Sequence, residues 1–166
     1  MKISKAAILS TTELFDNLSP TQLDLIESIC DVMQPAKGEI LFRENDSTDE
    51  LYVIARGGVE ILVDPGLVGL ETGLEPVVIA ELYQGQVLGE VALVDQGLRS
   101  ATARISQDDT QLLRISRERL MLLCDTYPVL GYKLMKNLAA DLALKIRNTD
   151  LTVRQYQLML SHDDSS

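Results

Sequence analysis

The chain has 166 residues, a length that suits one domain built around a single hydrophobic core. Twenty-five acidic and 15 basic side chains give a net charge of −10, so most of the surface repels nucleic acid and free-standing DNA binding is not expected. The one histidine, His162, lies in a polar tail, which argues against a His-based catalytic triad or metal site. Cys30 and Cys124 lie far apart within apolar runs and are expected to be buried free thiols.

The N-terminal sequence carries no targeting signal. Glu13 and Asp16 interrupt its apolar stretch too early for a signal peptide or a membrane span. We therefore expect a cytoplasmic protein that does not bind membranes.

The segment from Leu14 to Met33 has the apolar spacing of a helix. Ser19 is the predicted N-cap, Pro20 suits the first helical position, and Gln22 completes a capping box. Pro35 is expected to end this helix. The predicted apolar stripe comprises Leu23, Ile26, Ile29, Cys30 and Met33.

The middle of the chain, residues 37–116, consists of short runs rich in Val, Ile, Leu, Tyr and Thr. Turn residues such as Gly, Asp and Asn separate the runs, and the longest break spans residues 65–75. This pattern predicts a sandwich or barrel rather than a parallel α/β sheet. The predicted strands are residues 38–42, 50–55, 58–64, 76–83, 101–107 and 110–116.

Helical spacing returns after Ser116. A short helix is predicted over residues 117–124, and a second begins at Pro128 and can continue to about Tyr156. The predicted order is therefore helix, β-barrel, long helix within a single domain. Its expected parts are N-terminal helices (1–36), the barrel (37–116), C-terminal helices (117–158) and a polar tail (159–166).

The most informative stretch lies between residues 88 and 105. Gly85 and Gly89 are predicted to bracket a tight turn into a short helical turn, residues 90–93. Free backbone N–H groups at such a turn form a nest that accepts anions. Because Glu90 adds negative charge there, another residue must supply the positive charge.

Arg99 is the candidate for that positive charge. The barrel segment has six basic and fourteen acidic side chains, a net charge of 6 − 14 = −8, so an anion there needs a desolvated guanidinium that binds it bidentately. Arg99 lies beside small residues, Ser100 and Ala101, which let a ligand approach the backbone. Glu90 and Arg99 together suit a ligand with a hydroxyl pair and a phosphate, as in a nucleotide. The alternative is that Glu90 and Arg99 pair with each other in an empty barrel.

Two motifs, LGEVAL at residues 88–93 and RSAT at 99–102, resemble the phosphate-binding cassette of cyclic nucleotide-binding domains. LFDNLSPTQLDLI and ENDSTDELYVIARGGVEI also resemble segments of that family, so the resemblance covers nearly the whole chain. It implies a mainly β fold, a double-stranded β-helix or jelly-roll barrel, with an N-terminal helical segment and a long C-terminal helix. Leu88, Leu98 and Asn45 depart from the family pattern, but none of these departures removes a ligand contact.

The resemblance also implies a role for individual residues. Glu90 and the Gly89 backbone would hold the ribose 2′-hydroxyl, and Arg99 would pair with the cyclic phosphate. Ser100 and the Ala101 backbone would add donors. The full set of expected nucleotide-binding residues is Gly89, Glu90, Val91, Ala92, Arg99, Ser100, Ala101 and Thr102, of which Thr102 has a purely structural role as its alternative.

From these residues and the resemblance we expect a stand-alone cyclic nucleotide sensor and not an enzyme. cAMP is the first candidate ligand, and Ser100 leaves cGMP open. No cofactor or metal is expected. No nucleic acid is expected either, since no recognition helix follows Tyr156. The downstream protein partner is unidentified. The alternative is a ligand-free interaction domain on the same fold. A metal or 2-oxoacid site in a similar barrel is disfavoured because the predicted strands hold no histidine.

The long helix carries two apolar stripes. A helix that is apolar on two sides must bury both of them. The resemblance implies that one stripe covers the barrel and its ligand while the other forms a homodimer; the alternative is a monomer whose helix folds onto its own barrel. The first stripe, with heptad spacing, is Leu142, Ile146, Thr149, Val153, Tyr156 and Leu160, and the second is Leu144, Leu151 and Leu158.

Overall fold

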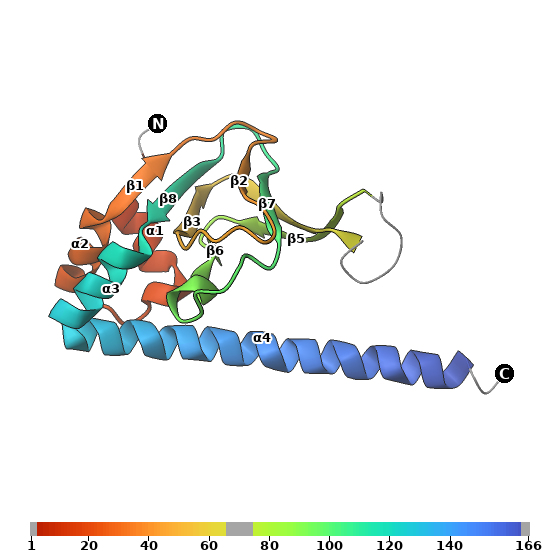
Figure 1. Ribbon diagram of the computed structural model, residues 1–166. Helices are drawn as coiled ribbons and strands as arrows, with labels where there is room; N and C mark the ends of the chain where they lie inside the picture. Colours follow the sequence, from red (N-terminus) through yellow and green to blue (C-terminus); the bar gives the residue numbers. More distant parts are fainter. Residues whose placement is uncertain (1–2, 66–74, 164–166) are drawn as a thin grey trace.

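The computed structural model describes residues 3–65 and 75–163. Figure 1 shows helices gathered at one end of a β-barrel, with the longest helix running beside the barrel and projecting beyond it. The helices are α1 (Lys5–Thr11), α2 (Pro20–Ser28), α3 (Arg117–Thr126) and α4 (Pro128–Asp163), with 3-10 turns η1 (Glu13–Phe15) and η3 (Glu90–Leu93). The strands are β1 (Cys30–Met33), β2 (Ile40–Phe42), β3 (Leu51–Arg56), β4 (Gly58–Val63), β5 (Val77–Tyr83), β6 (Val87–Leu88), β7 (Thr102–Ile105) and β8 (Gln111–Ile115).

Two four-stranded antiparallel sheets form the barrel. Their strand orders are β1-β8-β3-β6 and β2-β7-β4-β5, so strands distant in sequence are paired throughout. This arrangement is the jelly-roll barrel that the sequence predicted. One hydrophobic core lies between the two sheets, and a second joins the β1-β8-β3-β6 sheet to the helices. Residues 51–55 of β3 are all buried because this central strand contacts both cores.

The predicted helix over Leu14–Met33 is only partly correct. The capping box is confirmed, since the Ser19 N–H donates to Gln22 Oε1 at 2.9 Å and the Gln22 N–H donates to Ser19 Oγ. The helix ends at Ser28, however, and Cys30–Met33 forms β1 along the edge of β8. Pairing with β8 satisfies the backbone of these four residues and overrides their helical spacing.

Other boundaries also differ from the sequence prediction. Strand β2 is shorter than predicted, and β6 is a two-residue strand inside a stretch that the sequence had assigned to turns. β6 pairs with β3 through Leu88 and Tyr52, which brings the following turn against the barrel. The predicted break over residues 65–75 lies largely outside the described residues.

Helix α4 begins at Pro128, as predicted, and has two different halves. Leu130, Leu134 and Leu138 are completely or almost completely buried in the helical core. Asn137 fixes the same half by donating to the Leu14 carbonyl at 2.9 Å. Beyond Leu142, every described side chain is exposed, so most of both apolar stripes lies at the surface of the single chain.

Both cysteines are free and buried, as the sequence predicted. Burial raises the pKa of the Cys30 thiol to about 12, so this thiol stays protonated and unreactive at neutral pH. Among the described residues, no helix combines the length and hydropathy needed to cross a bilayer.

Candidate functional site

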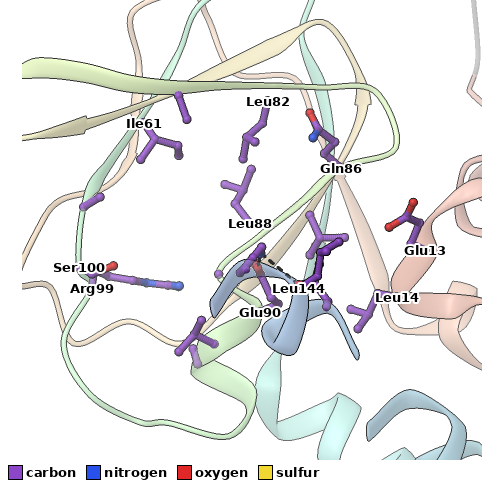
Figure 2. Close-up of a pocket in the computed structure, with 18 of the residues that line it drawn as sticks. Glu13, Leu14, Ile61, Leu82, Gln86, Leu88, Glu90, Arg99, Ser100 and Leu144 are labelled. Carbon is purple, nitrogen blue, oxygen red and sulfur yellow. Dashed lines mark hydrogen bonds and ion pairs between the residues drawn. The ribbon is translucent and has the colours of Figure 1, made fainter. Parts of the chain in front are cut away.

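A pocket of about 1270 Å³ lies between the barrel, η3, the N-terminal helices and α4. Figure 2 shows Arg99 and Ser100 on one side of it, Glu90 beside Leu144, and Glu13 with Leu14 on the other side. The pocket is larger than the 300–1,000 Å³ typical of small-molecule sites, because it extends from the barrel to the N-terminal helices. All the predicted site residues line it except Thr102, which lines a separate depression of about 370 Å³.

The tight turn into η3 is present, as the sequence predicted, and the structure shows that it depends on glycine at position 89. Gly89 has φ +82°, a left-handed conformation that side chains disfavour. A Cβ atom at Gly89 would also lie 2.6 Å from Arg99 Nη1 and 2.7 Å from the Glu50 carbonyl oxygen. Gly89 therefore allows the guanidinium to approach the backbone of the turn. The Ala92 N–H already donates to the Gly89 carbonyl at 3.1 Å, so this N–H is not free for an anion.

Arg99 is held deep in the pocket wall, with only 7% of its surface exposed. Its Nε donates to Thr48 Oγ1 at 3.2 Å, and Nη2 donates to the Glu50 carbonyl at 2.7 Å. The guanidinium also lies over the Phe42 ring, 4.2 Å from its centroid, in a cation–π contact. These contacts fix the orientation of the side chain but use neutral acceptors.

The charge of Arg99 is not neutralised by an ion pair. Within residues 3–65 and 75–163 no carboxylate lies within salt-bridge distance of its guanidinium. Burial lowers its pKa, and the nearby Tyr52 and the acidic residues Asp49, Glu50 and Asp46 oppose that shift. Arginine nevertheless stays protonated in proteins. The pocket therefore contains a buried, oriented cation, which is a binding site suited to an anion.

Glu90 begins η3 and is also buried, with 6% of its surface exposed. Its carboxylate forms an ion pair with Lys145 of α4 rather than with Arg99. Lys145 Nζ also contacts Asp141 Oδ2 at 3.0 Å on the same helix. The alternative raised by the sequence, an ion pair between Glu90 and Arg99, does not form in the structure.

A further arginine connects η3 to the C-terminal helices. Arg117, in the first turn of α3, donates through Nε to the Ala92 carbonyl at 3.0 Å and through Nη2 to the Leu93 carbonyl at 3.3 Å. These carbonyls lie at the C-terminal end of η3, where a cation is favourable. Arg117 thereby joins the end of η3 to the start of α3.

Strands β4, β5 and β6 give the pocket an apolar stretch of wall. Ile61 and Leu82 come from the paired strands β4 and β5, and Leu88 ends β6. Figure 2 shows these three side chains on the barrel side of the pocket, away from Glu13. The site therefore combines an anchored cation, a buried carboxylate and a hydrophobic wall, a combination that fits an anionic ligand with a hydroxyl group and a flat apolar part.

The predicted departures from the family pattern have simple structural consequences. Asn45 has φ +70°, which asparagine tolerates, and its N–H donates to the Arg99 carbonyl at 2.8 Å. Leu88 is buried, whereas Leu98 points to solvent with 62% of its surface exposed. Thr102 Oγ1 accepts a hydrogen bond from the Glu44 N–H at 3.0 Å, which supports the structural alternative for Thr102.

Sequence reasoning missed the residues that hold Arg99 and Glu90. Thr48 and Glu50 lie about fifty residues before Arg99, and Lys145 lies 55 residues after Glu90. The run ENDSTDELYVI, which contains Thr48 and Glu50, was noted only for its resemblance to the family. Lys145 gave one signal: it is a charged residue between Leu144 and Ile146, which belong to the two apolar stripes.

Comparison with known proteins assigns the chain to a family. The family model of the cyclic nucleotide-binding domain matches residues 33–127 of the chain. The chain belongs to the cyclic nucleotide-binding domain family. The match includes β2 to β8 together with η3, and therefore both Glu90 and Arg99.

Relatives of this domain include regulators and a kinase. The cyclic AMP receptor protein of Thermus thermophilus is 33% identical over 138 residues, which are 83% of this chain and 59% of that protein. Human cGMP-dependent protein kinase 2 is 28% identical over 110 residues, 66% of this chain and 14% of the kinase. The crystal structure of the Thermus thermophilus catabolite activator protein has a TM-score of 0.73 at 31% identity and covers 88% of this chain and 63% of that one. The chain thus spans less than two thirds of the length of these relatives.

Proposed function

We propose that this cyclic nucleotide-binding domain is a regulatory sensor that binds cAMP or cGMP in the pocket described above and responds by moving α4. The observation that carries the proposal is Arg99. Its guanidinium is buried, oriented by Thr48 and Glu50, and free of a carboxylate partner in the described part of the chain. A buried cation held in this way is costly unless an anion completes the site.

The other residues of the pocket provide complementary contacts. The cyclic phosphate pairs with Arg99, and Ser100 with the Ala101 backbone supplies further donors. The ribose 2′-hydroxyl donates to Glu90 beside the Gly89 turn. Val91 and Ala92 form the remainder of η3, and the base lies against the apolar wall. Relatives named for cAMP and for cGMP both occur, so the base preference is a matter for measurement.

A sensor suits this pocket better than an enzyme. Among the described residues that line it there is neither histidine nor cysteine, and no group of His, Cys, Asp and Glu in the described chain is arranged to hold a metal ion. The acidic composition disfavours DNA, so no mobility shift is expected with duplex DNA at low salt, where phosphate contacts are strongest. A retained duplex would contradict this part of the proposal.

In this proposal the sensor responds through the position of α4, and it acts as a homodimer. Ile146 and Val153 occupy a-type positions of the heptad stripe, where β-branched residues favour two strands. Ile146, Tyr156 and Leu160 are each more than 60% exposed in the single chain. A second copy of α4 would cover this stripe, and a downstream protein would recognise the resulting arrangement.

Calorimetric titration of the purified chain with cAMP and with cGMP tests the proposal. Saturable binding of either nucleotide at a stoichiometry of one per chain is expected. Because the ion pair between Glu90 and Lys145 already occupies part of the pocket, a ligand-free interaction domain is the second candidate. Absence of heat with both nucleotides, while the protein is folded by circular dichroism, would contradict the sensor and favour that second candidate.

A further inference from the structure

The ion pair between Lys145 and Glu90 joins two parts of the molecule that otherwise differ in burial. Lys145 lies at the start of the exposed half of α4, and its side chain is 53% exposed. Glu90 lies in η3 against the barrel, and its side chain is 8% exposed. The partner of the buried carboxylate is therefore a side chain that water can reach.

The same carboxylate is the group that would accept the ribose hydroxyl. Lys145 and Glu90 line one pocket, so a ligand that reaches Glu90 meets the lysine ammonium there. A carboxylate neutralised by an ammonium is a weaker acceptor for a hydroxyl than a free one, because charge-assisted hydrogen bonds depend on that charge. The ammonium and the ligand hydroxyl thus compete for Glu90.

Asp141 provides a second position for the displaced ammonium. Its carboxylate lies one turn before Lys145 on α4, with Oδ2 3.0 Å from Nζ, and its side chain is 35% exposed. A lysine that leaves Glu90 keeps this partner and gains water, so leaving does not create an unpaired buried charge. Lys145 thus contacts both carboxylates in this structure, and the contact with Asp141 lies within the helix and does not depend on Glu90.

We infer that Lys145 is a tethered competitor of the nucleotide: it ties α4 to Glu90 at the start of the exposed half until the ligand hydroxyl takes its place and leaves the lysine with Asp141. This inference rests on the proposed function, since it assigns the competing ligand to the same carboxylate. Ligand binding then releases the exposed half of α4 through the loss of this ion pair, because a ligand shifts an equilibrium only through its differential affinity for the two arrangements.

A binding experiment tests the competition. Lys145→Met keeps the length of the side chain and removes its charge, and Lys136→Met is the matched control on an exposed lysine of the same helix. Calorimetry with cAMP and cGMP is expected to show binding to Lys145→Met that is tighter by roughly 5- to 100-fold, the usual range of coupling between sites, and no change for Lys136→Met. Unchanged or weaker binding to Lys145→Met would overturn the inference.

A double-mutant cycle tests the role of Asp141. Asp141→Asn removes the second partner of Lys145, so it is expected to weaken nucleotide binding in the parent background. In the Lys145→Met background the same substitution should have no effect, because the lysine that pairs with Asp141 is absent. Equal weakening in both backgrounds would mean that Asp141 contacts the ligand itself, and would overturn the exchange between the two carboxylates.

A measurement without ligand separates this inference from the proposed function. Spin labels at Asp108→Cys in the barrel and Gln157→Cys in α4 report the distance between these two elements. The labels attach to the two introduced cysteines, since both native cysteines are buried. The parent should give a narrower distance distribution than either Lys145→Met or Glu90→Gln. Identical distributions would overturn the inference even if nucleotide binds. Broader distance distributions in the variants, with no nucleotide binding by the parent or the variants, would instead contradict the proposed function. The ion pair would then still restrain α4, but without a ligand to release it.

Discussion

The two ends of the pocket are built in different ways. Arg99 is held by the barrel, through hydrogen bonds to Thr48 and Glu50 and a ring contact with Phe42. Glu90 is paired with a lysine from a helix whose adjoining half is exposed to solvent. One end is thus a fixed anchor for an anion, and the other is an exchangeable contact. In the proposed function, the barrel end supplies the affinity and the helix end supplies the response.

The largest expected effect comes from removing the anchor. Arg99→Ala deletes a charge-assisted bidentate contact to the phosphate, which should weaken nucleotide binding by about 2–5 kcal/mol. Calorimetry of this variant checks the loss, with Arg56→Ala as a control on an exposed barrel arginine. Arg99→Lys keeps the charge without the planar fork and should recover only part of the affinity. Full affinity in Arg99→Ala would place the ligand elsewhere.

The next effect concerns the turn beside the anchor. Gly89→Ala imposes a side chain at φ +82° and forces its Cβ toward Arg99 and the Glu50 carbonyl. Strain of this kind costs about 1–3 kcal/mol of folding free energy. Chemical denaturation should show that loss, together with weaker nucleotide binding, because the guanidinium must move. Gly38→Ala is a useful comparison, since Gly38 also has a positive φ of +87° but its Cβ would meet no atom within 4 Å. A Gly89→Ala protein no less stable than Gly38→Ala would show that the close approach is unimportant.

A smaller effect is expected at the exchangeable end. Glu90→Gln keeps an oxygen that accepts from a hydroxyl, and it also removes the attraction for Lys145. Its effect on nucleotide affinity should therefore be about 1 kcal/mol or less, well below that of Arg99→Ala. The same calorimetric titration provides the comparison. A loss in Glu90→Gln equal to or greater than that in Arg99→Ala would reverse the assignment of the two ends.

The smallest expected effect on ligand affinity comes from the exposed half of α4. Ile146→Asp places a charge in the heptad stripe and should abolish a dimer of moderate affinity, because Thr149 already weakens the pairing. Light scattering with and without cAMP measures the mass of the parent and of this variant. A parent that stays monomeric at high concentration in both conditions would contradict the dimer.

Local signals in the sequence predicted those parts of the fold that depend on nearby residues. The capping box at Ser19 and Gln22, the start of α4 at Pro128 and the tight turn at Gly89 all follow from short-range chemistry. Strand β1 was mistaken for helix because its conformation depends on pairing with β8, about eighty residues later. The Gly89 turn and the small residues beside Arg99 indicated Glu90 and Arg99 as site residues, and the family resemblance added an expected role for each.

Contacts between distant residues explain what the sequence could not predict about the site. Whether Glu90 pairs with Arg99 or with another cation depends on where α4 crosses the pocket, and neither charge pattern nor spacing fixes that crossing. The structure places Lys145 there, and it also shows that Arg99 relies on Thr48 and a backbone carbonyl rather than on a carboxylate. These partners become visible only once the barrel and the helix are assembled.

The central claim is that Arg99 is the anion anchor of a cyclic nucleotide site. The most direct test is a titration of ¹⁵N-labelled protein with cAMP and cGMP, followed through the Arg99 Nε–H and Gly89 backbone resonances. The account predicts that both resonances shift and saturate together at one nucleotide per chain. Resonances at Arg99 and Gly89 that stay in place at saturating nucleotide, or that shift only without saturation, would contradict it.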